Sequence, residues 1–250
     1  MGIFAPDPEV QTAPTVAMPA NMTRWKAFGL HLLLSLTLIS GITLAALLVW
    51  YPHGLWRISG LDRLMAVMLV IDITAGPFLT LCIYRPGKWG LGFDLKVIAL
   101  VQAAFLAYGL HTLWQARPVF LVGTDVRFTL VSAKDVDPED LAKAARPEWQ
   151  KLPWTGPHLV GVIPPSDPAI RAALLDTLLK TGRDQEQLPS HYRPYDEVAS
   201  IVLAGALPLD GKSDAPKVPG EKGLPIRSWD KESWITVDPA TGAPGRVLGY

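Results

Sequence analysis

Three long apolar segments in the first half of the chain constrain its fold more than any other feature. They cover Ala27–Pro52, Leu64–Tyr84 and Val97–Ala116. Each contains a single ionisable side chain at most, respectively His31, Asp72 and His111. A bilayer core about 30 Å thick is crossed by roughly 20 helical residues. The segments therefore predict three membrane spans, at about 27–51, 64–84 and 96–115.

The charged residues divide the chain into two unequal parts. Of the 46 Asp, Glu, Lys and Arg residues, 12 fall in residues 1–116 and 34 in residues 117–250. This division predicts a transmembrane domain at 22–116 and a water-exposed domain at 117–250. The formal net charge is zero, so a nucleic-acid partner is not expected. The single cysteine, Cys82, excludes an internal disulfide framework.

The flanks of the segments indicate how they sit in a lipid bilayer. Aromatic residues cluster at or beyond the segment ends, where rings favour the headgroup layer: Trp25, Trp50, Tyr51, Trp56, Tyr84, Trp89 and Trp114. Five basic residues flank one side and four the other, which favours a cytoplasmic N-terminus. An odd number of spans then places residues 117–250 outside the cytoplasm. Residues 1–21 carry four prolines and are expected to be a disordered extension, with the translation start at Met1 or Met22.

Asp72 is the most informative residue of the membrane half. A lone carboxylate near mid-bilayer costs roughly 2.5–3.5 kcal/mol on insertion scales. We expect it to be protonated or to face a partner within the bundle. The candidate donors are Gln102 on the third span and Ser35, Thr37, Ser40 or Thr43 on the first. Gly76-Pro77 follows and interrupts the helix, because proline lacks an N–H donor. Two interpretations stay open, an internal polar contact between helices and an ion or helix-docking site.

Small residues mark a second candidate contact. Ala99, Ala103 and Ala107 recur four residues apart on the third span, a spacing that lets another helix approach closely. The ridge serves either packing within the bundle or docking of a partner's membrane helix. His53 and His111 are expected at similar depth, but no further feature of the sequence supports haem binding.

Residues 117–250 hold 16 of the 23 prolines, which predicts a loop-rich α+β domain. Its expected strands lie at 119–131 (broken at Gly123), 158–163, 224–226 and 234–237. Helices are expected from Asp137-Pro138 to about Ala145, from Asp167-Pro168 to Gly182, and over 196–206. In the second of these helices, apolar residues from Ile170 to Leu179 mark one face.

No nucleophile elbow, phosphate-binding loop or metal-binding motif is present, so catalytic, cofactor and metal sites are not expected. The densest polar cluster runs from His191 to Glu197. We interpret it as a proline-fixed aromatic patch that leads into a helix. Its candidate protein-contact residues are Tyr192, Pro194 and Tyr195.

Several short motifs occur along the chain in a characteristic order. They are Arg24-Trp25-Lys26-Ala27-Phe28, Tyr51-Pro52, Asp72 with Gly76-Pro77, Thr80-Leu81, Tyr108-Gly109, Ala116-Arg117-Pro118-Val119 and Asp238-Pro239-Ala240-Thr241-Gly242. In this order they resemble the type IV pilin accessory protein family, the TfpX/TfpZ group of FimB-like fimbrial assembly proteins. The resemblance covers roughly residues 22–250.

The resemblance implies a bacterial inner-membrane protein with a periplasmic C-terminal domain that promotes pilus assembly and surface display without an enzymatic site. The expected partners are a cognate type IV major pilin and the lipid bilayer. Within the bilayer, the expected helix-docking residues are Asp72, Gly76, Pro77, Ala99, Gln102, Ala103 and Ala107. The alternative is a membrane-tethered enzyme, redox protein or small-molecule sensor with an extracytoplasmic domain. The oligomeric state stays open.

Overall fold

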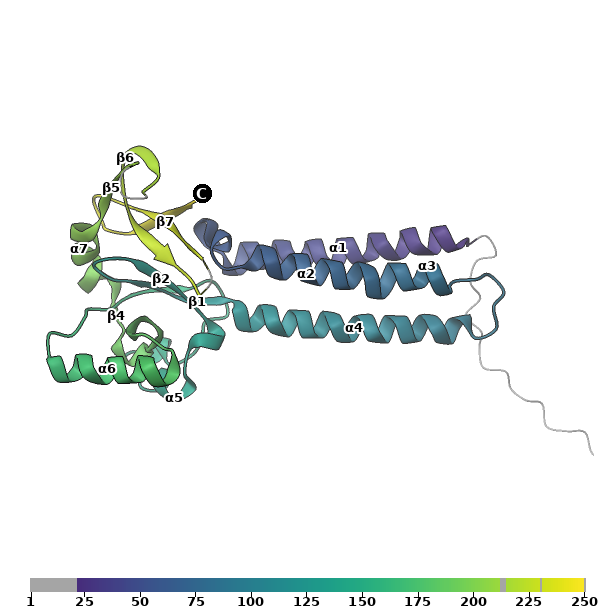
Figure 1. Ribbon diagram of the computed structural model, residues 1–250, viewed down its shortest axis with the longest axis horizontal. Coiled ribbons are helices and arrows are strands. Elements are labelled where there is room, and N and C mark those ends of the chain that lie inside the picture. Colours follow the sequence, from purple (N-terminus) through teal and green to yellow (C-terminus); the bar gives the residue numbers. More distant parts are fainter. Residues whose placement is uncertain (1–21, 212–214, 230, 250) are drawn as a thin grey trace, which may run out of the picture.

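The computed structural model describes residues 22–211, 215–229 and 231–249. The expected disordered extension at 1–21 lies outside the described residues. A long bundle of three helices carries a mixed α+β domain at one end (Figure 1). This architecture confirms the predicted fold class.

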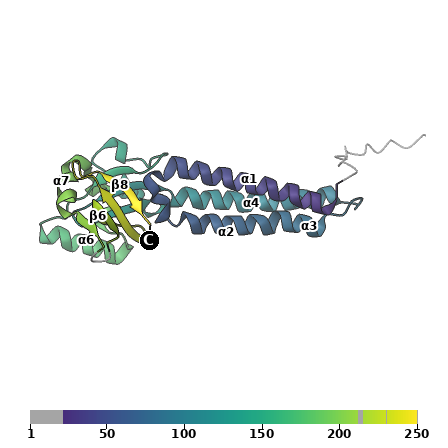
Figure 2. The ribbon, with the colours of Figure 1, turned by 90° about the horizontal axis from the view of Figure 1, so that it is seen from above.

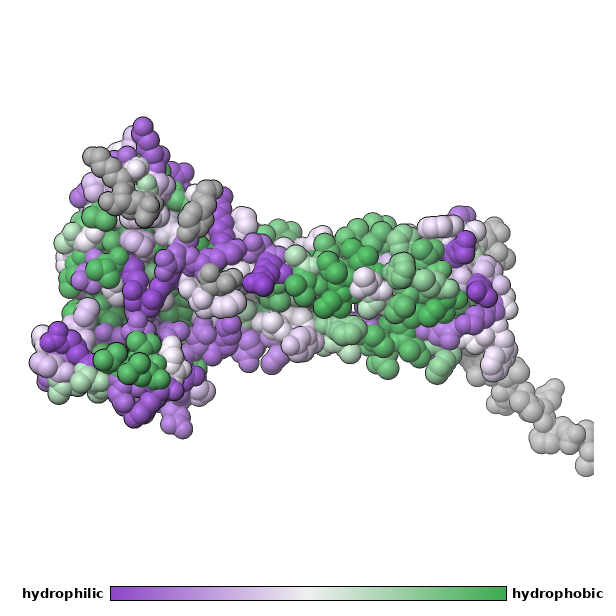
Figure 3. Space-filling view, viewed as in Figure 1, coloured by the Kyte–Doolittle hydropathy of each residue, from purple (hydrophilic) through white to green (hydrophobic). Residues whose placement is uncertain are grey.

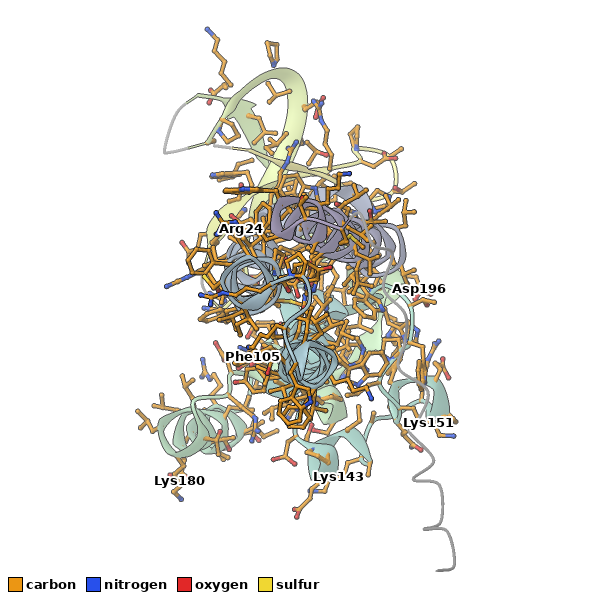
Figure 4. The ribbon with its side chains drawn as sticks, turned by 90° about the vertical axis from the view of Figure 1, so that its right-hand side faces the viewer. Arg24, Phe105, Lys143, Lys151, Lys180 and Asp196 are labelled. Carbon is orange, nitrogen blue, oxygen red and sulfur yellow. The ribbon has the colours of Figure 1, made fainter. Side chains whose placement is uncertain are left out.

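Each span of the bundle is long and apolar enough to cross a membrane. The first is α1 (Arg24–Trp50), the second combines α2 (Leu61–Ile73), η2 (Thr74–Phe78) and α3 (Leu79–Ile83), and the third is α4 (Leu91–Ala116). The second span contacts both of the others. The view from above (Figure 2) and the view along the bundle (Figure 4) show the three spans side by side.

Pro77 widens the second span without breaking it. The proline has no N–H to donate, and the chain accommodates it in a single π-helical turn, η2. The helix resumes directly as α3. The interruption that the sequence suggested at Gly76-Pro77 is therefore a local bulge within one continuous span.

On the face shown in Figure 3, hydrophobic residues form a belt over the middle of the bundle, and hydrophilic residues gather toward its ends and over the domain. Many large apolar side chains of the spans are exposed on this belt, among them Leu33, Leu48, Val70 and Leu100. Such a surface suits lipid and is unusual for a helical bundle in water.

The domain is built on one mixed sheet in the strand order β4-β3-β1-β2-β6-β7-β8, with β5 paired to β6. Its strands are β1 (Pro118–Gly123), β2 (Phe128–Ser132), β3 (His158–Gly161), β4 (Arg193–Pro194), β5 (Leu207–Asp210), β6 (Lys217–Arg227), β7 (Glu232–Val237) and β8 (Pro244–Leu248). Its helices are α5 (Pro138–Leu141), α6 (Pro168–Thr181) and α7 (Tyr195–Gly205). Short 3-10 turns η3 (Ala133–Asp135), η4 (Pro147–Trp149), η5 (Gln185–Gln187) and η6 (Pro189–His191) lie between them.

The central strands bury side chains on both faces of the sheet. Successive residues of a strand point to opposite faces. Phe120 accordingly packs with Trp149 and Tyr192 on one side, whereas Leu121 joins the core that α7 covers on the other. The second core continues into the tip of the bundle, where it includes Leu55 and Ile58.

Several elements of the domain differ from expectation, including β4, which was not predicted as a strand, and β6, which begins at Lys217 rather than at 224. Helix α5 ends at Leu141, and β5 and β8 had no strand signal strong enough to predict them. Helix α6 begins and ends at the expected residues, with Asp167 capping its first turn and Gly182 in the left-handed conformation after its last. However, none of its residues is buried, and Leu179 is 77% exposed.

The domain is tied directly to the outer ends of the spans. Arg57 donates to the carbonyl oxygen of Val247, and the Trp50 indole donates to that of Trp154 at 2.8 Å. Lys231 forms an ion pair with Asp62 at 3.0 Å. These contacts, together with the shared core, fix the sheet against the bundle.

Candidate functional site

A hydrogen-bonded network connects all three spans at the level of Asp72. Its hub is Gln102 on α4, whose amide nitrogen donates to the Asp72 carboxyl oxygen Oδ1 at 2.7 Å and to the Ser35 hydroxyl at 2.9 Å. The amide oxygen of Gln102 lies 2.7 Å from His31 Nε2. His31 Nδ1 in turn lies 2.8 Å from the hydroxyl of Thr80. The network therefore joins α1, α2, α3 and α4.

The network defines the tautomer of His31. Because the Gln102 amide oxygen can only accept, Nε2 of the imidazole must carry the hydrogen and donate it. In the neutral ring, Nδ1 is then an acceptor for the Thr80 hydroxyl. Every group of the ring that can form a hydrogen bond is thus satisfied inside the bundle, as a membrane interior requires.

Gly76 leaves the room that Gln102 occupies. A Cβ atom at this position would lie 2.6 Å from Cδ of Gln102, closer than side-chain atoms approach one another. A larger residue at this position would require the Gln102 side chain to leave its present place. Gly76 and its neighbour Pro77 are both buried, so these two predicted docking residues face the bundle interior.

We expect Gly76→Ala to displace the Gln102 side chain and to lower the free energy of unfolding by about 1–3 kcal/mol, the usual cost of overpacking. Gly41→Ala is the matched control, because a Cβ at Gly41 of α1 meets no atom within 4 Å. Unfolding of both variants in mixed detergent micelles measures the difference. Equal stability of the two variants would show that Gln102 can move at no cost.

Asp72 is the least satisfied member of the network. It is 5% exposed, and within the described residues its second carboxyl oxygen, Oδ2, has no hydrogen-bond partner. Gln102, the donor that the sequence suggested, serves only Oδ1. A buried polar atom without a partner in a membrane interior costs several kcal/mol, so this oxygen needs an explanation.

A cavity of about 240 Å³ opens beside Asp72 between α2 and α4. Its lining is almost entirely apolar: Ile39, Leu64, Val67, Met68, Ile71, Asp72, Phe105, Leu106, Tyr108, Gly109 and Thr112. Phe105, labelled in Figure 4, lies on the α4 side of this opening. The only carboxyl group of the spans' interior thus borders a hollow that faces the lipid.

The small residues of α4 lie elsewhere on that helix. Ala99, Ala103 and Ala107 are all exposed, so the ridge takes no part in the core of the bundle. By the helical period of 3.6 residues, Ala103 lies on the flank of α4 opposite to Thr112 of the cavity. Helix α4 therefore presents two different surfaces to lipid, a smooth ridge and a cavity wall.

The predicted contact residues of the domain lie in different environments. Tyr192 is only 2% exposed and donates its hydroxyl to the carbonyl oxygen of Glu186, and it lines the hollow next to α6. This burial also raises the pKa of its phenol well above the ordinary value. Tyr195 is half-buried, stacks on Phe128 and donates to Gly242. Pro194, on the edge strand β4, borders an open hollow next to α6.

Sequence reasoning missed His31 and Thr80 as members of the network. His31 carried one signal that could have placed it there, since an ionisable side chain inside a span usually faces a polar partner. Thr80 carried no such signal. His53 and His111, the pair at similar expected depth, are both exposed. Across 22–211, 215–229 and 231–249, no group of three His, Cys, Asp or Glu residues is placed to hold a metal ion.

Together these features define a protein with three helices long and apolar enough to span a membrane, joined by polar contacts, and an α+β domain packed against one end of them. Two curated relatives have the same extent of similarity. Fimbrial assembly proteins of Dichelobacter nodosus from serogroups I and E1 are 29% and 27% identical over 186 residues, which cover 74% of this chain and 72% of each relative. A third, from serogroups C1 and C2, is 31% identical over 121 residues, 48% of this chain and 92% of that protein.

The chain therefore belongs to the family of fimbrial assembly proteins. No protein-family model and no solved structure matches it. The family membership confirms the resemblance found in the sequence and assigns the protein a role in fimbrial assembly at a membrane.

Proposed function

We propose that the protein is a non-catalytic accessory factor that binds a type IV pilin in the bacterial inner membrane and promotes its assembly into surface pili. The observation that carries this proposal is the exposed ridge of Ala99, Ala103 and Ala107 on a protein of the fimbrial assembly family. Small side chains let the backbones of two membrane helices approach closely. The ridge is not used within the bundle and is therefore available to a partner helix.

The proposed topology places the N-terminus in the cytoplasm and the domain in the periplasm. The start of α1 and the connection from α3 to α4 lie at the end of the bundle that is remote from the domain (Figure 1). These segments and the first turns of α4 carry Arg24, Lys26, Arg85, Lys88 and Lys96. A surplus of basic residues favours the cytoplasmic side. Reporter fusions after residue 88 and after residue 249 test this arrangement directly.

The domain also offers a surface for the globular part of a pilin. The apolar face of α6 is only partly covered: Ile170, Leu175 and Leu179 are exposed, whereas Leu174 and Leu178 are half-buried. Pro194 borders a hollow beside the start of this helix, where Ile170 is also found. We include these residues in the proposed contact surface together with Tyr192, Pro194 and Tyr195, the contact residues that the sequence predicts.

Lengthening the ridge side chains should weaken pilin binding. We expect the double variant Ala103→Leu and Ala107→Leu to recover at least fivefold less pilin in detergent pull-downs, since overpacking costs about 1–3 kcal/mol. Ala66→Leu on α2 is the control, because Ala66 is also exposed to lipid and lies on another span. Deletion of the gene should reduce surface pili, and normal piliation of a clean deletion strain would refute the proposed function.

A further inference from the structure

Two segments of the α+β domain reach the end of the bundle at which the spans meet the domain. The first is the loop that follows η4, at 150–157, and the second follows β6, at Ser228 and Trp229. Each carries a tryptophan with a largely exposed side chain: Trp154 is 76% exposed and Trp229 is 57% exposed. Because an amphipathic indole ring favours the headgroup layer of a membrane, the depth of these two rings relative to the spans decides what contacts them.

Trp154 lies at the same depth as the last turns of two spans. Its ring centroid is 4.9 Å from that of Trp114, in the last turn of α4. Its carbonyl oxygen accepts a hydrogen bond at 2.8 Å from the indole of Trp50, the last residue of α1. Trp50 and Trp114 belong to the membrane-spanning helices, so the ring of Trp154 lies beside the ends of the spans although it belongs to the domain.

Arg117 holds the loop at this depth. It follows α4 directly and is only 3% exposed. Its guanidinium carbon lies 3.5 Å from the ring centroid of Trp114, a close cation–π contact. The same guanidinium group donates to the carbonyl oxygens of Trp114 at 2.6 Å and of Pro153 at 3.4 Å. The residue before Trp154 is therefore tied to the end of α4, and the exposed ring is fixed against the span.

Trp229 lies at the same end of the bundle, near the start of α2. The neighbouring Ser228 donates its hydroxyl to the carbonyl oxygen of Ile58, just before α2 begins. The ammonium nitrogen of Lys134 lies 4.3 Å from the centroid of the Trp229 ring. The backbone N–H of the residue before Lys134 donates to the carbonyl oxygen of Arg117 at 3.0 Å. Trp229 and the exposed Lys134 thus lie near both the start of α2 and the end of α4.

The chemistry of these side chains fits phospholipid headgroups. An indole ring has an apolar body that suits the boundary of the acyl chains and an N–H that donates to ester or phosphate oxygens. The ammonium group of Lys134 supplies a cation for a phosphate group. The contact between Trp154 and Trp114 also makes this surface continuous with the lipid-facing side of the bundle. A bilayer that surrounds the spans therefore meets both exposed tryptophans.

We propose that the α+β domain is seated on the bilayer through Trp154 and Trp229, whose rings lie in the headgroup layer beside the cation of Lys134. The occupant of this surface is phospholipid, and the domain is held both by its contacts with the bundle and by the membrane below it. This seating requires that the spans cross a bilayer, as in the proposed function. It requires neither pilin binding nor a particular orientation.

Labels on single cysteines locate the two rings relative to the bilayer. Cys82 is the only cysteine of the chain, so Cys82→Ala provides the background. Trp154→Cys and Trp229→Cys are introduced separately, labelled with a polarity-sensitive fluorophore and reconstituted in phosphatidylcholine vesicles without pilin. Thr155→Cys repeats the measurement with both rings in place and covers the case in which the loss of Trp154 loosens the loop.

Val126→Cys is the matched control, because Val126 is 59% exposed, like Trp229. Its turn meets the end of α7, at the end of the domain remote from the bundle (Figure 1). We expect labels at 154, 155 and 229 to emit at shorter wavelengths than the label at 126. They should lose most of the quenching by aqueous iodide that position 126 shows. A nitroxide lipid labelled at its headgroup should quench them and leave position 126 unquenched.

Equal emission and equal iodide quenching at 126, 154 and 229 would overturn the seating of the domain on lipid. Shielding of 154 and 229 that occurs only after pilin is added would also overturn it, because the occupant is then the pilin. A protein whose labels lie in the headgroup layer but which recovers no pilin from detergent would retain the lipid contact and contradict the proposed function instead.

Discussion

Replacing Gln102 with leucine should lower the free energy of unfolding of the bundle by about 2–5 kcal/mol. The substitution removes hydrogen bonds to His31, Ser35 and Asp72 at once. Each hydrogen bond between membrane helices contributes about 0.6 kcal/mol on average and at most about 1.7 kcal/mol. The loss is large because Asp72 is then left without any of its described hydrogen bonds.

The control for this experiment is Gln115→Leu on the same helix. Gln115 is exposed near the end of α4, and its replacement should leave stability within about 0.5 kcal/mol. Unfolding in mixed micelles of increasing denaturing detergent, followed by tryptophan fluorescence, compares the two variants. If both unfold at the same detergent fraction, the polar network contributes nothing to the association of the spans.

Gly205→Ala should destabilise the extramembrane domain by about 3 kcal/mol, although alanine normally stabilises a helix relative to glycine by about 1 kcal/mol. Gly205 is the last residue of α7, and a Cβ atom there would overlap with the carbonyl oxygen of Asp125. That oxygen belongs to the turn between β1 and β2. Either the helix or the turn must move, because backbone atoms cannot rotate away as a side chain can.

The expected change in the free energy of unfolding for Gly205→Ala has the opposite sign to the usual effect of alanine in a helix, so the experiment separates the two cases clearly. Gly92→Ala on α4 is the control, since a Cβ at Gly92 meets no atom within 4 Å and the usual preference for alanine should apply. Thermal unfolding followed by circular dichroism reports on the domain. A Gly205→Ala protein as stable as the wild type would mean that α7 does not approach the turn so closely.

The number of spans and the pairing of Asp72 with Gln102 could be predicted because a bilayer imposes strict rules on length and polarity. The rotation of each helix about its own axis could not be predicted. The lipid-facing side of a span such as α4 is as apolar as its inner side, so hydrophobicity does not mark the face that packs. His31 and Thr80 therefore remained unassigned until the spans were placed together.

In the domain, capping residues and turns were the most reliable signals. Asp167 and Gly182 bound α6 as predicted, and the turn after β7 forms at Asp238. The apolar face that the sequence marks on α6 is only partly covered, since an amphipathic pattern indicates that one face leaves water but not what covers it. The contact role of Tyr192 stays a prediction. Its side chain is largely buried, and an aromatic side chain suits a core as well as a surface.

The short connection from α4 to β1 restricts the stage at which the domain can contact a pilin. The helix ends at Ala116 and the strand begins at Pro118, so no tether separates the sheet from the lipid surface. The domain consequently cannot move far from the membrane end of α4. In the proposed function, the domain binds only a pilin that is still embedded in the bilayer beside it. It releases that pilin when the pilin leaves the bilayer.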